Sequence, residues 1–242
     1  MLLMVTAMMF SCGNKTAGSD VVNDTVVSKV KINGDSTLYG LACEGCTDSV
    51  LVFLSFDGGD PVTFDIIEAS KRKKIIGRPE TGDWVGVVLN KEDSTKADMV
   101  IDLDQLKGTW VYMAMPKLRE NNSKTMNVYV DEQQRDSVLK SLMVPKEQGF
   151  ALKRNSVATP IGFVFDKSGD EDNPVVYPEV KLYTDWSISN GRLVLKGRSK
   201  ESIKNKAKSK DTLVADTADF IFMMKDSLQL RFKDGVRSYY RK

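Results

Sequence analysis

The stretch that decides the fold reads LKGTWVY and covers residues 106–112. Gly108 has no Cβ and can take backbone conformations that other residues avoid. Trp110, two positions later, offers a large flat apolar surface that can seal one end of a small domain. The segment from Leu106 to Lys242 has the length of one such domain.

Beyond this stretch, short alternating apolar runs are separated by turn residues, which is typical of antiparallel strands. Asn190-Gly191 is the strongest hairpin motif, and Asn155-Ser156 marks a second bend. One helix is expected over residues 132–143, ended by Pro145. We therefore predict an all-β fold, an up-and-down antiparallel barrel, with strands at residues 149–155, 157–165, 180–188, 192–196, 216–225, 227–233 and 236–241.

Aromatic side chains recur at alternate positions of these predicted strands, so they are expected to point into the barrel. Eight strands enclose a space that side chains fill or that holds one small apolar molecule. Because period-two aromatic stripes are usually core, a filled interior is favoured over a ligand pocket. The candidate ligand-lining residues are Tyr112, Phe163, Phe165, Tyr183, Trp186, Phe220, Phe222 and Phe232.

The Gly-X-Trp motif and the order of the later segments resemble the lipocalin-like domain of Gram-negative lipoproteins. The matching segments are LKGTW at 106–110, YTDW at 183–186, KDSLQL at 225–230 and YYRK at 239–242. The resemblance implies a lipocalin-like barrel and an envelope location. It also implies that an arginine from the last strands stacks on the tryptophan, so the barrel-closing residues would be Gly108 and Trp110 with Arg231, Arg237 or Arg241.

A second β-rich segment, residues 36–105, precedes the barrel. Strands are expected at residues 37–42, 49–54, 61–68, 74–77, 83–90 and 97–103. This number of strands in so short a segment predicts a small barrel or sandwich. The turn from Gly77 to Asp83 before an apolar strand is similar to that of OB-type barrels.

The chain begins with an apolar run over residues 1–11, which ends at Ser11-Cys12-Gly13. This pattern resembles a bacterial lipoprotein signal peptide, although no basic residue precedes the apolar run and Met9 replaces the usual Leu. The resemblance implies cleavage before Cys12 and its lipidation, which would anchor the protein in the cell envelope, at the outer membrane. Residues 12–35 are then a flexible polar tether. The alternative is a buried N-terminal segment with a chance cysteine.

Cys43 and Cys46 lie between two strand-like runs. In an envelope protein this pair is expected to form a disulfide or to remain as two thiols at a hairpin tip. Thiol exchange is disfavoured because a redox CxxC normally begins a helix. The chain has no histidine, which excludes His-dependent triads and imidazole metal sites. We therefore expect no enzyme activity, no metal and no cofactor.

The charge is uneven: residues 36–105 carry 7 basic and 13 acidic side chains, and residues 106–242 carry 25 and 17. The overall net charge of +2 gives no reason to expect nucleic acid as a partner. A lysine-rich stretch at 200–210 is expected to be a solvated loop. The sequence leaves two functions open: a lipid-anchored protein whose barrel binds a small apolar or amphiphilic ligand, or an interaction protein with a filled barrel that contacts envelope proteins or glycans.

Overall fold

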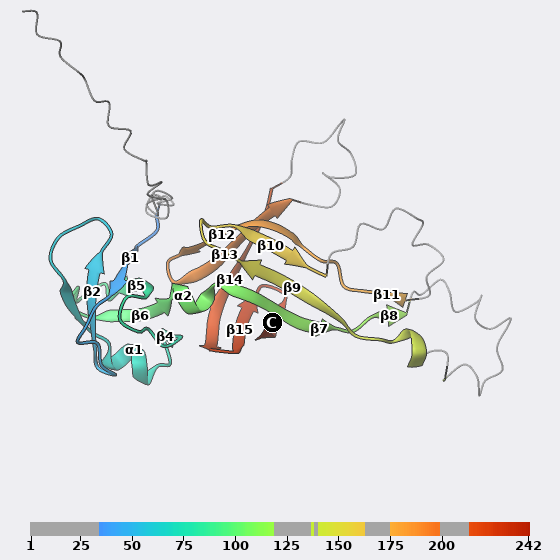
Figure 1. The fold of residues 1–242 in the computed structure, drawn as a ribbon, viewed down its shortest axis with the longest axis horizontal. Coiled ribbons are helices and arrows are strands. Elements are labelled where there is room, and N and C mark those ends of the chain that lie inside the picture. The colour runs from blue at the N-terminus through green and yellow to red at the C-terminus, as the bar shows by residue number, and fades with distance from the viewer. Residues whose placement is uncertain (1–33, 119–136, 138–139, 163–174, 199–212) are drawn as a thin grey trace, which may run out of the picture.

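The computed structural model describes residues 34–118, 137, 140–162, 175–198 and 213–242. Two β-sheet bodies lie end to end, with the short helix α2 between them (Figure 1). The N-terminal body contains β1 Thr37–Ala42, β2 Val50–Ser55, β3 Val62–Asp65, α1 Ile67–Lys71, β4 Ile75–Ile76, β5 Trp84–Leu89 and β6 Ala97–Asp102. Then come α2 Leu103–Leu106, β7 Gly108–Ala114, β8 Lys117–Leu118, β9 Lys146–Leu152, β10 Ala158–Ile161, β11 Val175–Val176, β12 Leu182–Ser189, β13 Arg192–Arg198, β14 Leu213–Met224, β15 Ser227–Phe232 and β16 Gly235–Arg241.

The N-terminal body, called here the N-terminal barrel, is a sheet in the order β3-β2-β1-β5-β6-β4. A parallel bridge between Asp65, at the end of β3, and Lys96, just before β6, partly closes this sheet. The Asp65 N–H donates to the Thr95 carbonyl oxygen at 2.9 Å. With α1 between β3 and β4, this sheet forms a small, partly open barrel, and its assignment to the OB type stays a prediction.

The predicted strand over residues 61–68 is wrong in its second half. The chain leaves β3 at Asp65 and forms α1. The Asp65 carboxylate accepts a hydrogen bond from the Ile67 N–H at 2.8 Å, which starts the turn. The β-branched residues of this segment favour a strand, but the hydrogen bond to the Asp65 side chain ends the strand and begins a helix.

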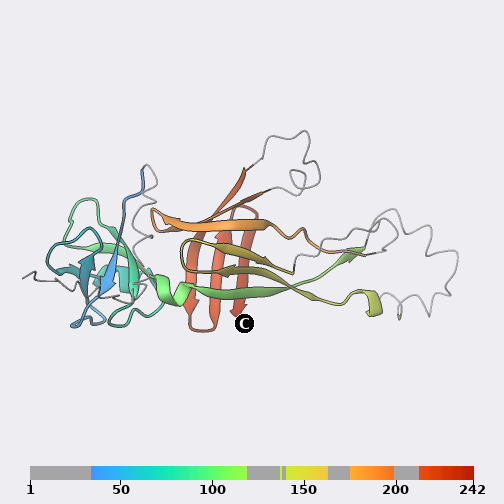
Figure 2. The ribbon, with the colours of Figure 1, turned by 45° about the horizontal axis from the view of Figure 1, so that its top comes forward.

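The C-terminal body, called here the C-terminal barrel, is an eight-stranded sheet in the order β10-β9-β7-β16-β15-β14-β13-β12. Every neighbouring pair in this order is antiparallel. Its two edges meet through a bridge between Val157 and Asp185, and the Trp186 N–H donates to the Ser156 carbonyl oxygen at 2.8 Å. The predicted lipocalin-like up-and-down barrel is confirmed (Figure 2, where the red strands cross the green and yellow ones).

The predicted bends adopt the backbone conformations that their residues favour. Asn190 and Gly191 have φ of 49° and 72° and connect β12 to β13. Asn155 and Ser156 have φ of 58° and 61° between β9 and β10. Asn tolerates this left-handed region better than most residues, and Gly has no Cβ to obstruct it.

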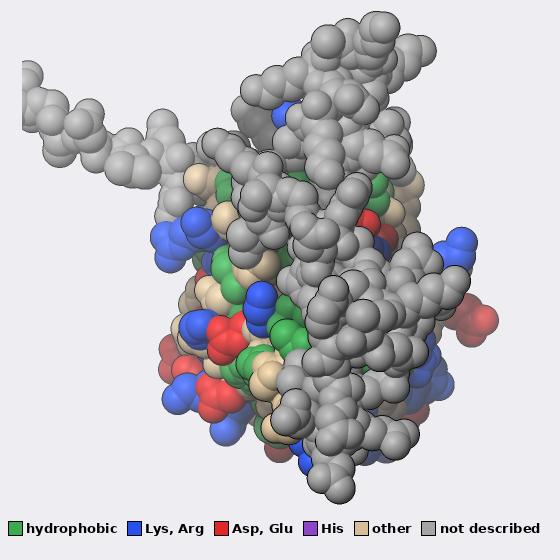
Figure 3. Space-filling model, turned by 90° about the vertical axis from the view of Figure 1, so that its right-hand side faces the viewer, with side chains coloured by type: hydrophobic (Ala, Val, Ile, Leu, Met, Phe, Trp, Pro, Cys, Tyr) green, Lys and Arg blue, Asp and Glu red, His purple; other side chains and the backbone are tan. Residues whose placement is uncertain are grey.

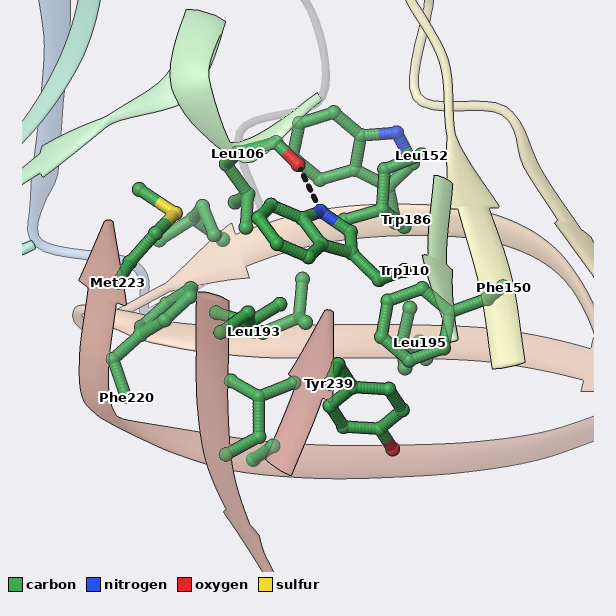
Figure 4. Packing of buried hydrophobic residues seen from close by; sticks show 14 of the residues in the cluster. Leu106, Trp110, Phe150, Leu152, Trp186, Leu193, Leu195, Phe220, Met223 and Tyr239 are labelled. Atoms are coloured by element: carbon green, nitrogen blue, oxygen red, sulfur yellow. Dashed lines mark hydrogen bonds between the residues drawn. The ribbon is translucent and has the colours of Figure 1, made fainter. Parts of the chain in front are cut away.

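Trp110 lies at the centre of the C-terminal core and is fully buried (Figure 4). Its indole Nε1 donates to the Leu106 carbonyl oxygen at 2.8 Å. Of the arginines considered, Arg241 lies over the indole, 4.2 Å from the ring centroid. A Cβ on Gly108, where φ is 141°, would stand 2.1 Å from the Arg241 Nη1, so the glycine of the motif makes room for this guanidinium.

Two other predicted placements need correction. Arg231 is exposed because the alternation of β15 turns Leu230 and Phe232 inward. Phe222 is 42% exposed because a register shift between Phe220 and Phe222 changes which side chains of β14 face the interior. Phe163 and Phe165 lie outside the described residues, as does most of the predicted helix at 132–143.

We expect Trp110→Ala to lower the free energy of unfolding by about 3–5 kcal/mol, because it leaves a large cavity in a closely packed core. Urea unfolding monitored by circular dichroism measures this loss. Phe222→Ala is the matched control and should cost less than about 1 kcal/mol, since its ring is partly exposed on the outer wall. Equal stability of the two variants would contradict the central role of Trp110.

Candidate functional site

The described part of the C-terminal barrel is packed with side chains rather than hollow. Tyr183, Trp186, Phe220 and Phe232, all predicted to line the interior, are buried in one cluster with Trp110. Three aromatic pairs in this interior have ring centroids 5.1–6.2 Å apart: Phe150–Tyr239, Tyr112–Tyr239 and Phe150–Tyr183. The inward aromatic residues therefore form a core.

The hydroxyls inside this core are paired with protein groups. Tyr183 donates to the Asp216 carboxylate at 2.6 Å, and burial together with this carboxylate raises the pKa of Tyr183 well above its usual value. The Tyr112 hydroxyl lies 3.1 Å from Gln148 Oε1. Gln148 in turn donates to the Pro178 carbonyl oxygen at 3.0 Å. These contacts stabilise the core and leave the hydroxyls little capacity to hold a ligand.

A cleft with a volume of about 440 Å³ lies between the two barrels. The N-terminal barrel contributes β1, the start of β5 and the turn after β2, and α2 lies beside them. The C-terminal barrel contributes β12 and the turn between β9 and β10. Cavities of this size commonly hold small ligands. We treat this cleft as the candidate functional site.

Four aromatic side chains line the cleft: Tyr39, Phe56, Trp84 and Trp186. Phe56 and Trp84 are half-buried and pack edge to face, with centroids 4.8 Å apart. The Trp186 Nε1 donates to the Lys153 carbonyl oxygen at 2.8 Å. The polar atom of that indole is therefore already occupied.

The Tyr39 hydroxyl connects the two walls of the cleft. It lies 2.9 Å from Asp35 Oδ2 and 2.8 Å from the Ile188 carbonyl oxygen, and it donates its one proton to this pair of acceptors. Burial and the charge of Asp35 raise the pKa of Tyr39, so the phenol stays protonated at neutral pH. Tyr39 is thus a fixed donor between the two barrels.

Two carboxylates of the cleft, Asp35 and Asp104, are occupied by protein donors. Asp104 accepts the Trp84 N–H at 2.7 Å and forms an ion pair with Lys107. The Lys107 Nζ also lies 5.1 Å from the centroid of the Trp84 ring. Burial alone would raise the pKa of Asp35, but hydrogen bonds from Asn190, Thr37 and Tyr39 lower it overall.

The Asn190-Gly191 turn fixes the spacing of the two barrels. Asn190 Oδ1 accepts hydrogen bonds from the Ser36 N–H at 2.9 Å and the Ser36 Oγ at 2.8 Å. The Gly191 N–H donates to Thr37 Oγ1 at 3.3 Å, and a Cβ on Gly191 would stand 2.8 Å from the Met99 sulfur. The turn that sequence analysis assigned to a hairpin therefore also binds the N-terminal barrel.

Asp102 begins α2, the helix that carries Leu103 and Asp104 to the cleft. The carboxylate accepts the Gln105 N–H at 2.7 Å, which is a helix N-cap. The residue is only 1% exposed, and burial raises the pKa of Asp102 to about 6. An ionisable group thus holds the segment between the two barrels.

The other sequence-predicted residues lie apart from the cleft. Cys43 and Cys46 are free thiols near the turn between β1 and β2, and the Cys46 sulfur lies 3.1 Å from the Cys43 carbonyl oxygen. Cys12 and the 200–210 loop lie outside the described residues. Within the described ranges, there is no cluster of acidic, cysteine or histidine side chains suited to a metal ion. The helices of that same part of the chain are too short or too polar to cross a membrane.

The cleft could not be predicted from the sequence because its residues come from distant segments. Tyr39, Phe56 and Trp84 each belong to a different strand or turn of the N-terminal barrel. One clue was present, since Trp84 and Phe56 are large aromatics next to turns rather than in the middle of strands. Only the docking of the second barrel makes them line a common site.

The sequence matches no protein-family model and no curated protein sequence. Among solved structures, it is similar to a lipocalin-like protein from Bacteroides thetaiotaomicron VPI-5482, with 16% identity and a TM-score of 0.30. The match covers 56% of this chain and 94% of that chain. The fold assignment made above rests on the strand pairing.

We expect Asp102→Asn to remove a pH dependence of stability. Because the folded pKa of Asp102, about 6, exceeds its unfolded value of 3.8, its favourable contribution is complete below pH 3.8 and is lost as the pH rises through 6. The asparagine keeps the N-cap acceptor. As the pH is raised from acidic to mildly alkaline, the free energy of unfolding of the variant should therefore rise by about 2–3 kcal/mol relative to that of the parent.

Urea unfolding of both proteins at several pH values measures this difference. Asp98→Asn serves as the control, because Asp98 precedes Asp102 on the same strand and is half-exposed. A constant stability difference between parent and Asp102→Asn across the pH range would rule out the ionisation of Asp102 as its cause.

Proposed function

We propose that this chain is a lipid-anchored binding protein of the cell envelope whose ligand lies in the cleft between the barrels. The cleft and its four aromatic side chains support this proposal more than any other feature. The ligand would be a small amphiphilic molecule, with an apolar face toward the rings and hydrogen-bonding groups toward the opposite wall. This moves the site from the barrel interior, where the sequence resemblance suggested it.

Binding, rather than turnover, agrees with the chemistry of the cleft. Its carboxylates Asp35 and Asp104 accept hydrogen bonds from backbone N–H groups, and Lys107 is paired with Asp104. A general base needs an acceptor directed at a substrate. We therefore propose a role without catalysis, and without a bound metal or other cofactor.

The location is proposed from the sequence alone. The apolar leader before Cys12 would direct the chain to the envelope, and acyl groups on Cys12 would hold it at the outer membrane. The polar tether over residues 12–35 would then connect the membrane to the N-terminal barrel.

A second candidate function is an interaction protein with a filled barrel, contacting envelope proteins or glycans. It is favoured by exposed apolar side chains on the barrel wall, among them Met113, Phe222 and Met224, which are 50%, 42% and 61% exposed. Hydrophobic, basic and acidic side chains are interspersed on the face that Figure 3 shows. Exposed apolar groups scattered in this way are common on monomeric proteins, so this candidate ranks second.

We expect the parent protein to bind the uncharged dye Nile red saturably, and Trp84→Ala to weaken this binding about tenfold because it removes a ring from the cleft. Fluorescence titration measures the affinity. Phe222→Ala is the matched control, since its ring lies on the outer wall, and it should bind as the parent does. Unchanged affinity in Trp84→Ala would place the dye elsewhere.

We expect Cys12→Ser to release the protein from the membrane, because the hydroxyl cannot take the place of the acylated thiol. Fractionation of cells that express the parent and the variant in a Gram-negative host measures this. Cys43→Ser is the control and should remain with the membrane fraction. Equal membrane association of parent and Cys12→Ser would contradict the lipid anchor.

A further inference from the structure

We propose that the molecule held in the cleft is an uncharged sugar ring, part of a free oligosaccharide or of a longer glycan. This inference rests on the proposed function, because it names the chemical class of ligand for the same site. It follows from three properties of the cleft: its aromatic surface, its charge balance and the polar groups on the wall opposite.

The aromatic surface matches a ring with an apolar face. Phe56 and Trp84 belong to the same barrel and pack edge to face with centroids 4.8 Å apart, so they form adjoining parts of one apolar wall. The polar atoms of Tyr39 and Trp186 are engaged with the Ile188 and Lys153 carbonyl oxygens. These two rings therefore offer carbon surface rather than hydrogen bonds. A pyranose carries C–H groups on its faces, and these can pack against aromatic carbon.

The charge balance argues against an ionic ligand. Asp104 is neutralised by Lys107, and Asp35 already accepts the backbone N–H groups of Thr37 and Asn190. The other two charged side chains of the lining, Asp57 and Arg154, are of opposite sign and exposed. An ammonium or carboxylate ligand would have to displace these partners or remain unpaired in a partly enclosed site. Either event costs free energy. An uncharged ligand leaves the pairs intact.

The polar wall argues against an aliphatic chain. The turn between β9 and β10 brings Asn155 and Ser156 to the wall opposite Phe56 and Trp84, and Asp57 lies next to Phe56 on the N-terminal barrel. Ser187 of β12 also lines the cleft. An alkyl chain would displace water from these polar groups and would offer them no hydrogen bonds in its place. Hydroxyls around the edge of a sugar ring can both donate to them and accept from them.

Saturation-transfer NMR on the full chain tests the inference. The probes are neutral trisaccharides, namely maltotriose, cellotriose, chitotriose and mannotriose, each at about 10 mM so that millimolar affinities are detected. We expect at least one to receive saturation, strongest on the C–H protons of one ring face, and to displace the dye from the cleft. Trp84→Ala should weaken this binding about tenfold, and Trp84→Phe should retain most of it.

The outcomes separate the two proposals. If the dye binds in the cleft but no trisaccharide receives saturation or displaces it, the sugar inference is overturned and the proposed binding function stands. If neither the dye nor any trisaccharide binds, both fail. Saccharide binding that is unchanged in Trp84→Ala and in Phe56→Ala also overturns the inference, because the sugar then lies outside the cleft. Circular dichroism of each variant shows that it is folded.

Discussion

The contact between Arg241 and Trp110 holds the closed end of the C-terminal barrel together. The guanidinium lies over the indole, donates to the Lys107 carbonyl oxygen at 2.7 Å and also donates to the Gln105 carbonyl oxygen. These carbonyls end α2, so one side chain from the last strand joins the first strand of the barrel to the segment before it. Burial of the guanidinium lowers the pKa of Arg241, yet it stays charged at neutral pH because an arginine pKa starts far above that range.

Because α2 is fixed in this way, the two barrels share a core. Ile76, Ile101 and Leu103 precede the C-terminal barrel in sequence but pack in the same cluster as Trp110 and Met223. The predicted boundary after Gln105 falls inside α2, and the division into two domains stays a prediction. A shared core and the bonds of Asn190 hold the cleft walls at a set spacing, so a ligand would meet a preorganised site.

Much of the barrel could be predicted from the sequence, because strands and tight turns depend mainly on residues that are close together in the chain. Alternating apolar residues and the Asn190-Gly191 turn gave the strand positions and their order. The register shift that exposes Phe222 could not be predicted, since a bulge depends on how two strands pair rather than on one sequence. The choice of Arg241 among the arginines also depended on register, because it required Arg241 to pair with Trp110.

The position of the cleft follows from the way the barrel is stabilised. Trp110, Phe150 and Tyr239 fill the core of the barrel. A closely packed interior leaves little room for a ligand. The surface where the second barrel docks is different, because two convex bodies in contact leave a hollow beside their joint. Aromatic side chains near such a joint, here Phe56 and Trp84, are then half-buried and remain accessible to a ligand. In this fold, the cavity therefore lies at the joint between the two barrels. In an open barrel it would lie in the interior.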